Sequence, residues 1–228
     1  MKSLKYGDTY LYFDDEKSIK LYDKIKNTCY NIIKVMKDDQ RSYVALIEID
    51  GKNYVYKEPR EKNRRKWQRF LSIFRGSESK REYQNIKNIL KVGFNAATPY
   101  LAVEEKRGAM VVNSYLLYSY IEGRDGRAED MEAIAQELRE IHKKGYLHGD
   151  SHMANFLVGD GKIYLIDTKL MKNKYGRFGE IFEFIYLEES YGHPIEYDKE
   201  SFYYKMAMVL KRYLLGLGEL KKRLRGKK

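Results

Sequence analysis

The chain has 228 residues and a formal net charge of +11, from 44 Lys and Arg against 33 Asp and Glu. Hydrophobic residues make up 43% of it, which excludes a disordered protein, and the single cysteine excludes an intramolecular disulfide. No apolar run is long enough to cross a bilayer, and no signal-peptide pattern is present, so we expect a cytoplasmic protein. The basic charge predicts an acidic partner: a nucleotide, a nucleic acid, an anionic membrane surface or a phosphorylated substrate.

Alternating apolar residues in the N-terminal half predict strands over 31–35, 43–50 and 53–57. Lys57 closes the third of these strands, where kinases place the lysine that touches the α and β phosphates of ATP. A helix is expected over 79–90, and Glu82 in its first turns is the preferred partner for Lys57. Glu78 is the alternative, and it could instead serve the helix N-terminus, where negative charge is favoured.

The turn over 37–42 contains no glycine, whereas protein kinases use a glycine-rich loop here to bring backbone amides close to phosphate. Two interpretations stay open. Either Gln40, Arg41 and Ser42 contact phosphate through side chains and amides, or the turn stands back from the nucleotide.

Residues 62–75 predict a basic helix with four apolar side chains on one face: Trp67, Phe70, Leu71 and Phe74. Such a helix suits an anionic membrane surface or a phosphorylated glycolipid. The favoured alternative is that the apolar stripe packs onto the N-terminal sheet and that the basic face is solvated.

Two further strands are expected over 100–105 and 111–121, and Glu122-Gly123 then breaks the pattern. A hinge between two lobes would lie at this break, so we predict lobes over 1–121 and 122–228. The backbone at such a hinge reads adenine, which makes 119–122 the expected adenine edge and adds Glu122 to the cofactor site.

The next segment predicts a helix, a loop and a hairpin. Apolar residues at helical spacing indicate a helix over 128–144, and Gly145 is expected as its left-handed stop. After a loop, short strands over 156–158 and 163–166 are joined by turn residues at 159–161.

Three residues in this frame have the spacing that a kinase-like phosphotransferase needs: Asp150, Asn155 and Asp167. Asp150 would position and deprotonate an attacking hydroxyl. Asn155 and Asp167 would hold Mg²⁺ against the phosphates of ATP, because magnesium prefers oxygen ligands and takes few of them from protein.

On His148-Gly149-Asp150 through Asn155-Phe156, on Ile166-Asp167 and on Tyr120-Ile121-Glu122-Gly123, the chain resembles the lipopolysaccharide core heptose kinases, especially those acting on the second heptose. The resemblance implies an α+β, protein-kinase-like fold with two lobes. The N-terminal lobe would hold an antiparallel sheet plus a helix, and the C-terminal lobe would be reduced and mainly helical. It also implies phosphate transfer from ATP to a heptose hydroxyl of the lipid A-core acceptor, at the cytoplasmic face of the inner membrane.

Residue by residue, the resemblance makes Asp150 the catalytic aspartate, Asn155 and Asp167 the metal ligands, and Lys57 the ATP lysine. His148 stands where such kinases brace the catalytic loop by hydrogen bonds, and we include it with the cofactor site. Thr168-Lys169 follows Asp167 where protein kinases carry Phe-Gly, and no Ala-Pro-Glu segment appears, so a peptide acceptor is not expected.

The remaining basic residues suggest acceptor and membrane contacts. Lys169, Lys172 and Arg177 could contact phosphates or carboxylates of the core. A helix over 201–224 is expected to place most of its apolar stripe in the core of the second lobe. The basic tail over 221–228 could rest on acidic lipid headgroups or be solvated.

Two other functions compete with the sugar kinase. A small-molecule kinase of the aminoglycoside type shares the short motif, but it would need a larger, acidic C-terminal lobe. A non-catalytic nucleic-acid-binding protein would explain the charge but would leave Asp150, Asn155 and Asp167 without a role, so we expect no nucleic acid as partner. Zinc binding by His148 and His152 is a weaker alternative, since no cysteine pair completes the set.

Overall fold

The computed structural model describes the backbone of residues 1–224 and the side chains of residues 1–217, so the predicted basic tail over 221–228 lies outside the described side chains. The chain divides into two compact units. The first is Met1–Gly123 with Gly159–Asp167, and the second is Arg124–Val158 with the described residues from Thr168 onward. The predicted lobe boundary at 121 falls two residues from this division and stays a prediction, while 159–167 groups with the first unit.

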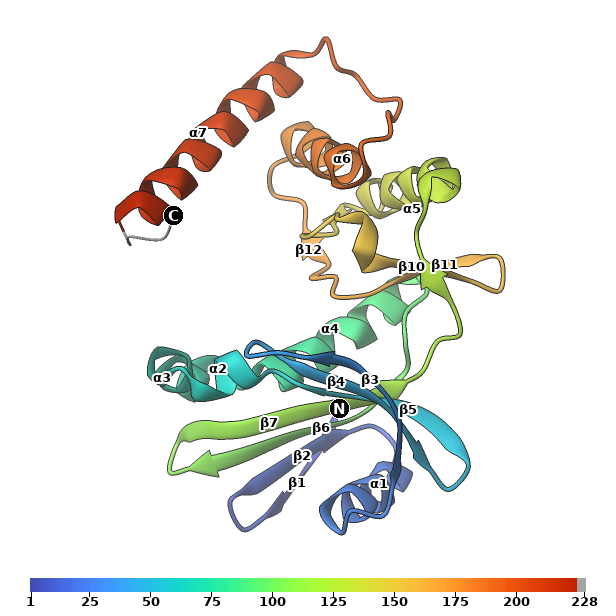
Figure 1. The fold of residues 1–228 in the computed structure, drawn as a ribbon, viewed down its shortest axis with the longest axis vertical. Coiled ribbons are helices and arrows are strands. Elements are labelled where there is room, and N and C mark those ends of the chain that lie inside the picture. Colours follow the sequence, from blue (N-terminus) through green and yellow to red (C-terminus); the bar gives the residue numbers. More distant parts are fainter. Residues whose placement is uncertain (225–228) are drawn as a thin grey trace. The chain divides into compact units, whose positions relative to one another are not determined.

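The first unit is built on an antiparallel sheet in the order β1-β2-β6-β7-β5-β4-β3 (Figure 1). Its strands are β1 (Lys2–Tyr6), β2 (Thr9–Phe13), β3 (Asn31–Asp38), β4 (Tyr43–Ile49), β5 (Lys52–Glu58), β6 (Pro99–Arg107) and β7 (Met110–Ser119). The five strands expected from the sequence are present. Lys57 lies on the fifth strand along the chain, not the third, because the β1–β2 hairpin precedes the strands that the sequence predicted.

Helices cover both faces of this sheet (Figure 1). They are α1 (Lys17–Lys26), α2 (Arg60–Arg64), α3 (Lys66–Arg75) and α4 (Glu78–Val92). The single helix expected over 62–75 is wrong in one respect, because extended backbone at Arg65 breaks it into α2 and α3. α3 and α4 both pack against β7, and α1 lies against the opposite face.

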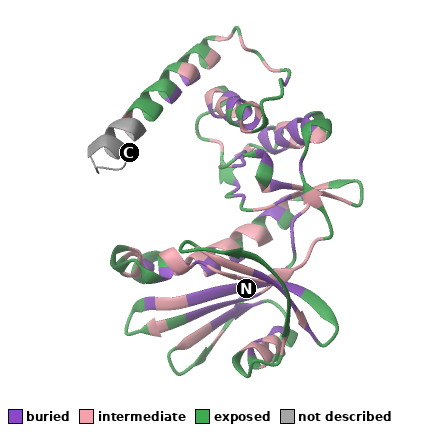
Figure 2. Cartoon of the chain, viewed as in Figure 1, coloured by how far each residue is buried: buried purple, intermediate pink, exposed green. Residues whose placement is uncertain are grey.

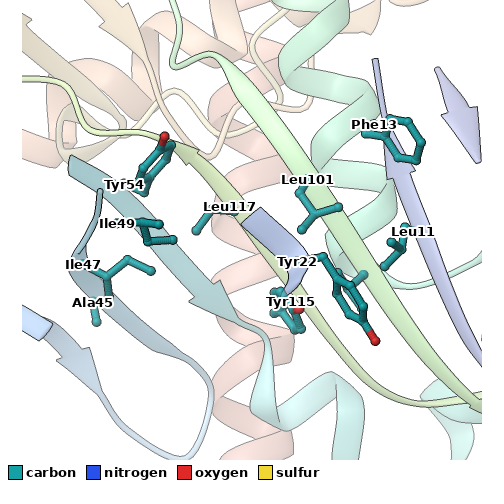
Figure 3. Packing of buried hydrophobic residues seen from close by; sticks show 11 residues of the cluster. Leu11, Phe13, Tyr22, Ala45, Ile47, Ile49, Tyr54, Leu101, Tyr115 and Leu117 are labelled. Carbon is teal, nitrogen blue, oxygen red and sulfur yellow. The ribbon is translucent and has the colours of Figure 1, made fainter. Parts of the chain in front are cut away.

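Strand alternation explains why the sheet is buried on both faces. On β7, Tyr115 and Leu117 join the cluster on the α1 side, together with Tyr22 of that helix (Figure 3). Leu116 between them points to the other face, where it packs with Tyr83 of α4. The central strands are accordingly drawn as buried in Figure 2, and they give a rigid support for residues at their ends.

The second unit is mainly helical. Its elements are β8 (Arg124–Asp125), a 3₁₀ turn (Ala128–Asp130), α5 (Met131–Lys143), β9 (Tyr146–Leu147), a second 3₁₀ turn (Met153–Asn155), β10 (Phe156–Gly159), β12 (Met171–Lys172), α6 (Arg177–Tyr191) and α7 (Phe202–Leu224). The strand β11 (Lys162–Leu165) belongs to the first unit. Gly145 has φ +79°, as expected for the stop of α5. Among the described residues, no helix has both the length and the apolar character needed to span a membrane.

Candidate active site

One cluster of charged side chains lies in the first unit. Lys57 at the end of β5 places its Nζ 2.8 Å from Glu82 Oε1 on α4 and also pairs with Asp167, which follows β11. The predicted pairing of Lys57 with Glu82 is therefore present. The alternative partner, Glu78, pairs with Lys62 and Arg81 instead.

The electrostatics of this cluster keep Lys57 charged. Burial alone would lower the pKa of the Lys57 ammonium, but Glu82 and Asp167 outweigh that effect and raise it well above its ordinary value. Burial also acts to raise the pKa of Asp167, but the attraction of Lys57 prevails and lowers it. The cluster thus presents a fixed ammonium next to an ionised carboxylate that is still 56% exposed, and this combination suits phosphate and a cation.

The position of Glu82 depends on how α4 is anchored. Ser77 caps the helix by accepting from Lys80 N at 3.0 Å, and Ser77 N donates to the fully buried Glu104 on β6 at 2.6 Å. Gly76 has φ +72°, and a Cβ there would lie 3.1 Å from Glu104 Oε1. Glycine is favoured at this turn because its φ is positive and because a Cβ would press on the buried Glu104 carboxylate.

The glycine-free turn after β3 is closed by its own aspartate. Asp39 Oδ1 accepts from Arg41 N and Ser42 N, both at 2.8 Å. These two amides, which could have contacted phosphate, are therefore already engaged.

The expected adenine edge ends at Glu122, whose side chain is exposed. The Glu122 carbonyl lies so close to Gly159 that a Cβ at 159 would approach it to 2.3 Å. Gly159 therefore lets the segment before β11 pass directly beside this edge. The role of Glu122 in cofactor binding stays a prediction.

The second unit holds the loop that carries Asp150, and Glu183 of α6 organises it. Glu183 Oε2 accepts from His148 N at 2.9 Å, and Glu183 Oε1 accepts from Gly149 N at 2.6 Å. His142 Nε2 of α5 lies 2.9 Å from the same carboxylate, and Ser151 Oγ donates to the Glu183 carbonyl at 2.8 Å. Both oxygens of a carboxylate that is 7% exposed are thus used to fix the loop from beneath.

Asp150 itself is held by its backbone while its side chain is left available. Its carbonyl accepts from His152 N at 2.7 Å and from Asn155 Nδ2 at 2.8 Å. Within the described residues, its exposed carboxylate makes no hydrogen bond. Because Asn155 donates through Nδ2, its Oδ1 is the atom left for a cation, so the contacts of Asn155 are compatible with the magnesium-binding role that the sequence predicted, and that role stays a prediction.

His148 lies entirely within the second unit and is fully buried. Its Nε2 lies 2.8 Å from Thr168 Oγ1, and its carbonyl accepts from Lys169 N at 3.0 Å. These contacts tie the loop to the residues that directly follow Asp167 in the chain. They are those of a bracing residue, and the inclusion of His148 in the cofactor site stays a prediction.

Burial lowers the pKa of His148 from 6.5 to about 4. Below pH 6.5 the unfolded chain therefore binds a proton that the folded protein excludes, so we expect stability to fall as the pH falls from 6.5 to about 4. The share due to His148 is about 3 kcal/mol. Urea unfolding across this pH range should show a shallower dependence in His148→Asn, whereas the exposed His193→Asn should behave like the parent. Equal slopes in all three proteins would contradict this assignment.

A cavity of ≈ 500 Å³ in the second unit opens beside Asp150. Its walls come from the loop, from α6 and from α7: Leu147, Gly149, Asp150, Ser151, Met171, Tyr175, Phe178, Gly179, Phe182, Glu183, Tyr186, Leu210 and Leu214. Most of this lining is aromatic or aliphatic. A largely apolar cavity with one free carboxylate at its wall is the usual form of a small-molecule site.

The three basic residues expected near the acceptor differ in their contacts. Lys169 lies against Gly149, whose added Cβ would be 3.0 Å from Lys169 Cβ, and both Lys169 and Lys172 are exposed. Arg177 pairs with Asp198 at 3.0 Å. Of these three residues, Lys169 is therefore the one that lies directly beside the loop carrying Asp150.

Sequence reasoning missed Glu183 and His142, which the structure brings together under this loop. Glu183 lies in a segment whose apolar residues do not keep to one face, so no helix was expected there. A glutamate within such an apolar stretch was the available signal, because a carboxylate is rarely buried unless it is paired.

Comparison with known proteins agrees with these observations. The chain matches the family described as "Lipopolysaccharide core biosynthesis protein (WaaY)" over residues 1–227. The lipopolysaccharide core heptose(II) kinase WaaY of Escherichia coli K12 is 26% identical over 144 residues, which are 60% of this chain and 62% of that protein. A second Escherichia coli heptose(II) kinase WaaY is 24% identical over 72% of this chain and 76% of its own length. The match to the K12 protein thus spans less than two thirds of its length.

Among solved structures, WaaP in complex with acyl carrier protein shares the fold, with a TM-score of 0.55 and 13% identity over 95% of this chain and 98% of that one. The fold class expected from the sequence is confirmed: this is an α+β protein of the protein-kinase-like class, with an antiparallel N-terminal sheet and a mainly helical second unit. Within that class, the chain belongs to the WaaY family of lipopolysaccharide core biosynthesis proteins.

Proposed function

We propose that this protein transfers the γ-phosphoryl group of ATP to a heptose hydroxyl of the lipopolysaccharide core, and that the acceptor is the second heptose. The observation that carries the proposal is the free carboxylate of Asp150 at the wall of a ≈ 500 Å³ cavity. The curated relatives are named heptose(II) kinases, which supports the acceptor.

In this proposal the second unit handles the acceptor. A sugar hydroxyl in the cavity donates to Asp150, whose carboxylate orients it and takes its proton as the oxygen attacks. Glu183 keeps the loop in place through His148 N and Gly149 N, so the carboxylate does not have to be ordered during the reaction. Lys169 beside the loop is available for an anionic group on the core.

In the same proposal, charged residues of the first unit bind the phosphate donor, ATP. Lys57, held cationic by Glu82, would contact the α and β phosphates of ATP, and Asp167 of the same unit would be a ligand of Mg²⁺. Asn155, the other predicted magnesium ligand, belongs to the second unit. When bound, magnesium neutralises charge on the phosphate oxygens. With an acceptor anchored in a lipid bilayer, the protein would act as a peripheral protein at the cytoplasmic face of the inner membrane.

The test is transfer of label from γ-labelled ATP to purified core lipopolysaccharide that lacks heptose phosphate. We expect label in a core that carries the second heptose, and none in a core truncated after the first. Equal labelling of both acceptors would contradict the choice of heptose. Absence of label in both, with ATP bound, would overturn the sugar-kinase proposal.

A further inference from the structure

Helix α3 of the first unit has its amphipathic faces reversed relative to a typical surface helix. Its buried side is polar: Ser72 is 6% exposed, accepts from Val111 N at 2.9 Å, and donates to the Arg69 carbonyl. Arg69 in turn donates to the Asn63 carbonyl at 2.6 Å. The expectation that the apolar stripe of this segment packs onto the sheet is therefore wrong, because polar contacts hold this face of the helix.

The outer side carries the aromatic residues. Trp67 is 65% exposed and Phe74 is 78% exposed, with Phe70 between them, and Figure 2 colours much of the helix as exposed. The three rings follow one another along the helix: Trp67 and Phe70 are stacked with centroids 5.7 Å apart, and Phe70 and Phe74 meet edge to face with centroids 5.9 Å apart. They form a raised ridge that we call the α3 ridge. Leaving three aromatic side chains in water is unfavourable, so the ridge is suited to a partner.

Positive charge surrounds the α3 ridge. Residues 60–75 include seven Lys and Arg and one acid, Glu61, and α3 itself has no acidic residue. Lys66 and Arg75 fall on opposite flanks of the aromatic row by the helical period. Among the described residues, Arg64 and Lys66 make no ion pair. A partner of the α3 ridge must therefore have both an apolar region that accommodates the rings and negatively charged groups that meet the cations.

We infer that the α3 ridge inserts into the interface of an anionic lipid bilayer. This inference deepens the proposed function. It rests on that proposal in one respect only, namely that the acceptor is anchored in a membrane. Tryptophan and phenylalanine favour the boundary between headgroups and acyl chains, and the flanking cations meet acidic headgroups. A second copy of this chain fits poorly, since a two-fold contact through the α3 ridge would bring the same cations face to face.

The chain's single tryptophan makes the test direct, because Trp67 is its only indole fluorophore. The full-length protein is mixed with vesicles of phosphatidylcholine, with and without phosphatidylglycerol, and no ATP. We expect a shift of Trp67 emission to shorter wavelength, and quenching by lipids brominated on the acyl chain, only with the anionic vesicles. Binding to vesicles without quenching, or no binding, would overturn the inference.

Two pairs of variants locate the contact. Phe74→Ser should weaken vesicle binding roughly tenfold, whereas Phe202→Ser, which removes an aromatic ring that is similarly exposed at 73% on α7, should leave it unchanged. The double variant Arg64→Gln/Lys66→Gln should weaken vesicle binding roughly twentyfold. Its control, Lys20→Gln/Lys52→Gln, removes the same charge elsewhere on the first unit and should weaken binding much less. Equal effects within either pair would contradict a contact at the α3 ridge.

Two further measurements separate the other outcomes. Phosphoryl transfer to a detergent-dispersed acceptor should persist in Phe74→Ser, so a failure of the proposed function is distinguishable from a failure of membrane contact. Sedimentation of the free protein should give a monomer with Trp67 emission typical of an exposed indole. A dimer with shorter-wavelength emission before lipid is added would assign the α3 ridge to a second copy and overturn the inference.

Discussion

Replacing Asp150 with asparagine should lower the turnover number for phosphoryl transfer by about 10³-fold, the usual contribution of a positioned general base. Asparagine keeps the size of the side chain and leaves the backbone clamp from His152 N and Asn155 Nδ2 in place. It removes the negative charge that accepts the proton of the attacking hydroxyl. Because Asp150 is not among the residues assigned to ATP or Mg²⁺, and the substitution keeps the bond from Asn155 Nδ2 to its carbonyl, the affinity for ATP should change little. Steady-state kinetics and calorimetric titration with ATP measure the two quantities.

Asp160→Asn is the matched control for this variant. Asp160 is exposed in the turn between β10 and β11 and has φ +50°, a conformation that asparagine also adopts readily. This control should keep the turnover and stability of the parent protein. If Asp150→Asn lost less than about tenfold, or lost ATP affinity in step with turnover, the role of Asp150 as base would be wrong.

Much of the fold could be predicted because most elements have strong local patterns. The strands of the central sheet alternate clearly, and α5 carries one apolar stripe ended by Gly145. The β1–β2 hairpin was missed because Lys2–Tyr6 is a mostly exposed edge strand whose charges hide the alternation. The buried helix α6 was missed because it has apolar residues on more than one face.

The residues of the candidate site also fall into two groups, those that local sequence patterns indicate and those that depend on tertiary packing. Lys57, Glu82, Asp150, Asn155 and Asp167 were chosen from the sequence because a kinase-like reaction requires those residue types in that order; the structure brings Lys57, Glu82 and Asp167 together, and the roles of all five stay predictions. The supports of the site could not be chosen in this way, since a buried carboxylate beneath a loop depends on tertiary packing alone. The orientation of α3 was also beyond the sequence, because periodicity identifies a stripe but does not say which side faces the protein.

Glu183 should be the support whose loss matters most. Glu183→Ala would leave His148 N and Gly149 N without their acceptor in a buried place, and it would also unpair His142, which we expect to lower the unfolding free energy by about 3–5 kcal/mol. Glu180→Ala, one turn earlier on α6 and half-buried, should lower it by less than about 1 kcal/mol. Urea unfolding of the two variants measures the difference.

A conservative variant separates support of the loop from support of the fold. Glu183→Gln should remain folded, because its carbonyl oxygen can still accept from one of the two loop amides, His148 N or Gly149 N. The acceptor is then neutral instead of charged, and the side-chain NH₂ group faces the other amide, which it cannot accept from. The loop should then hold Asp150 less firmly, so we expect turnover to fall about tenfold, with ATP affinity unchanged and stability reduced by about 1–2 kcal/mol. A variant with full turnover despite that loss of stability would show that Glu183 serves the fold alone. A lower turnover number with unchanged ATP affinity would identify Glu183 as the residue that positions the loop carrying Asp150.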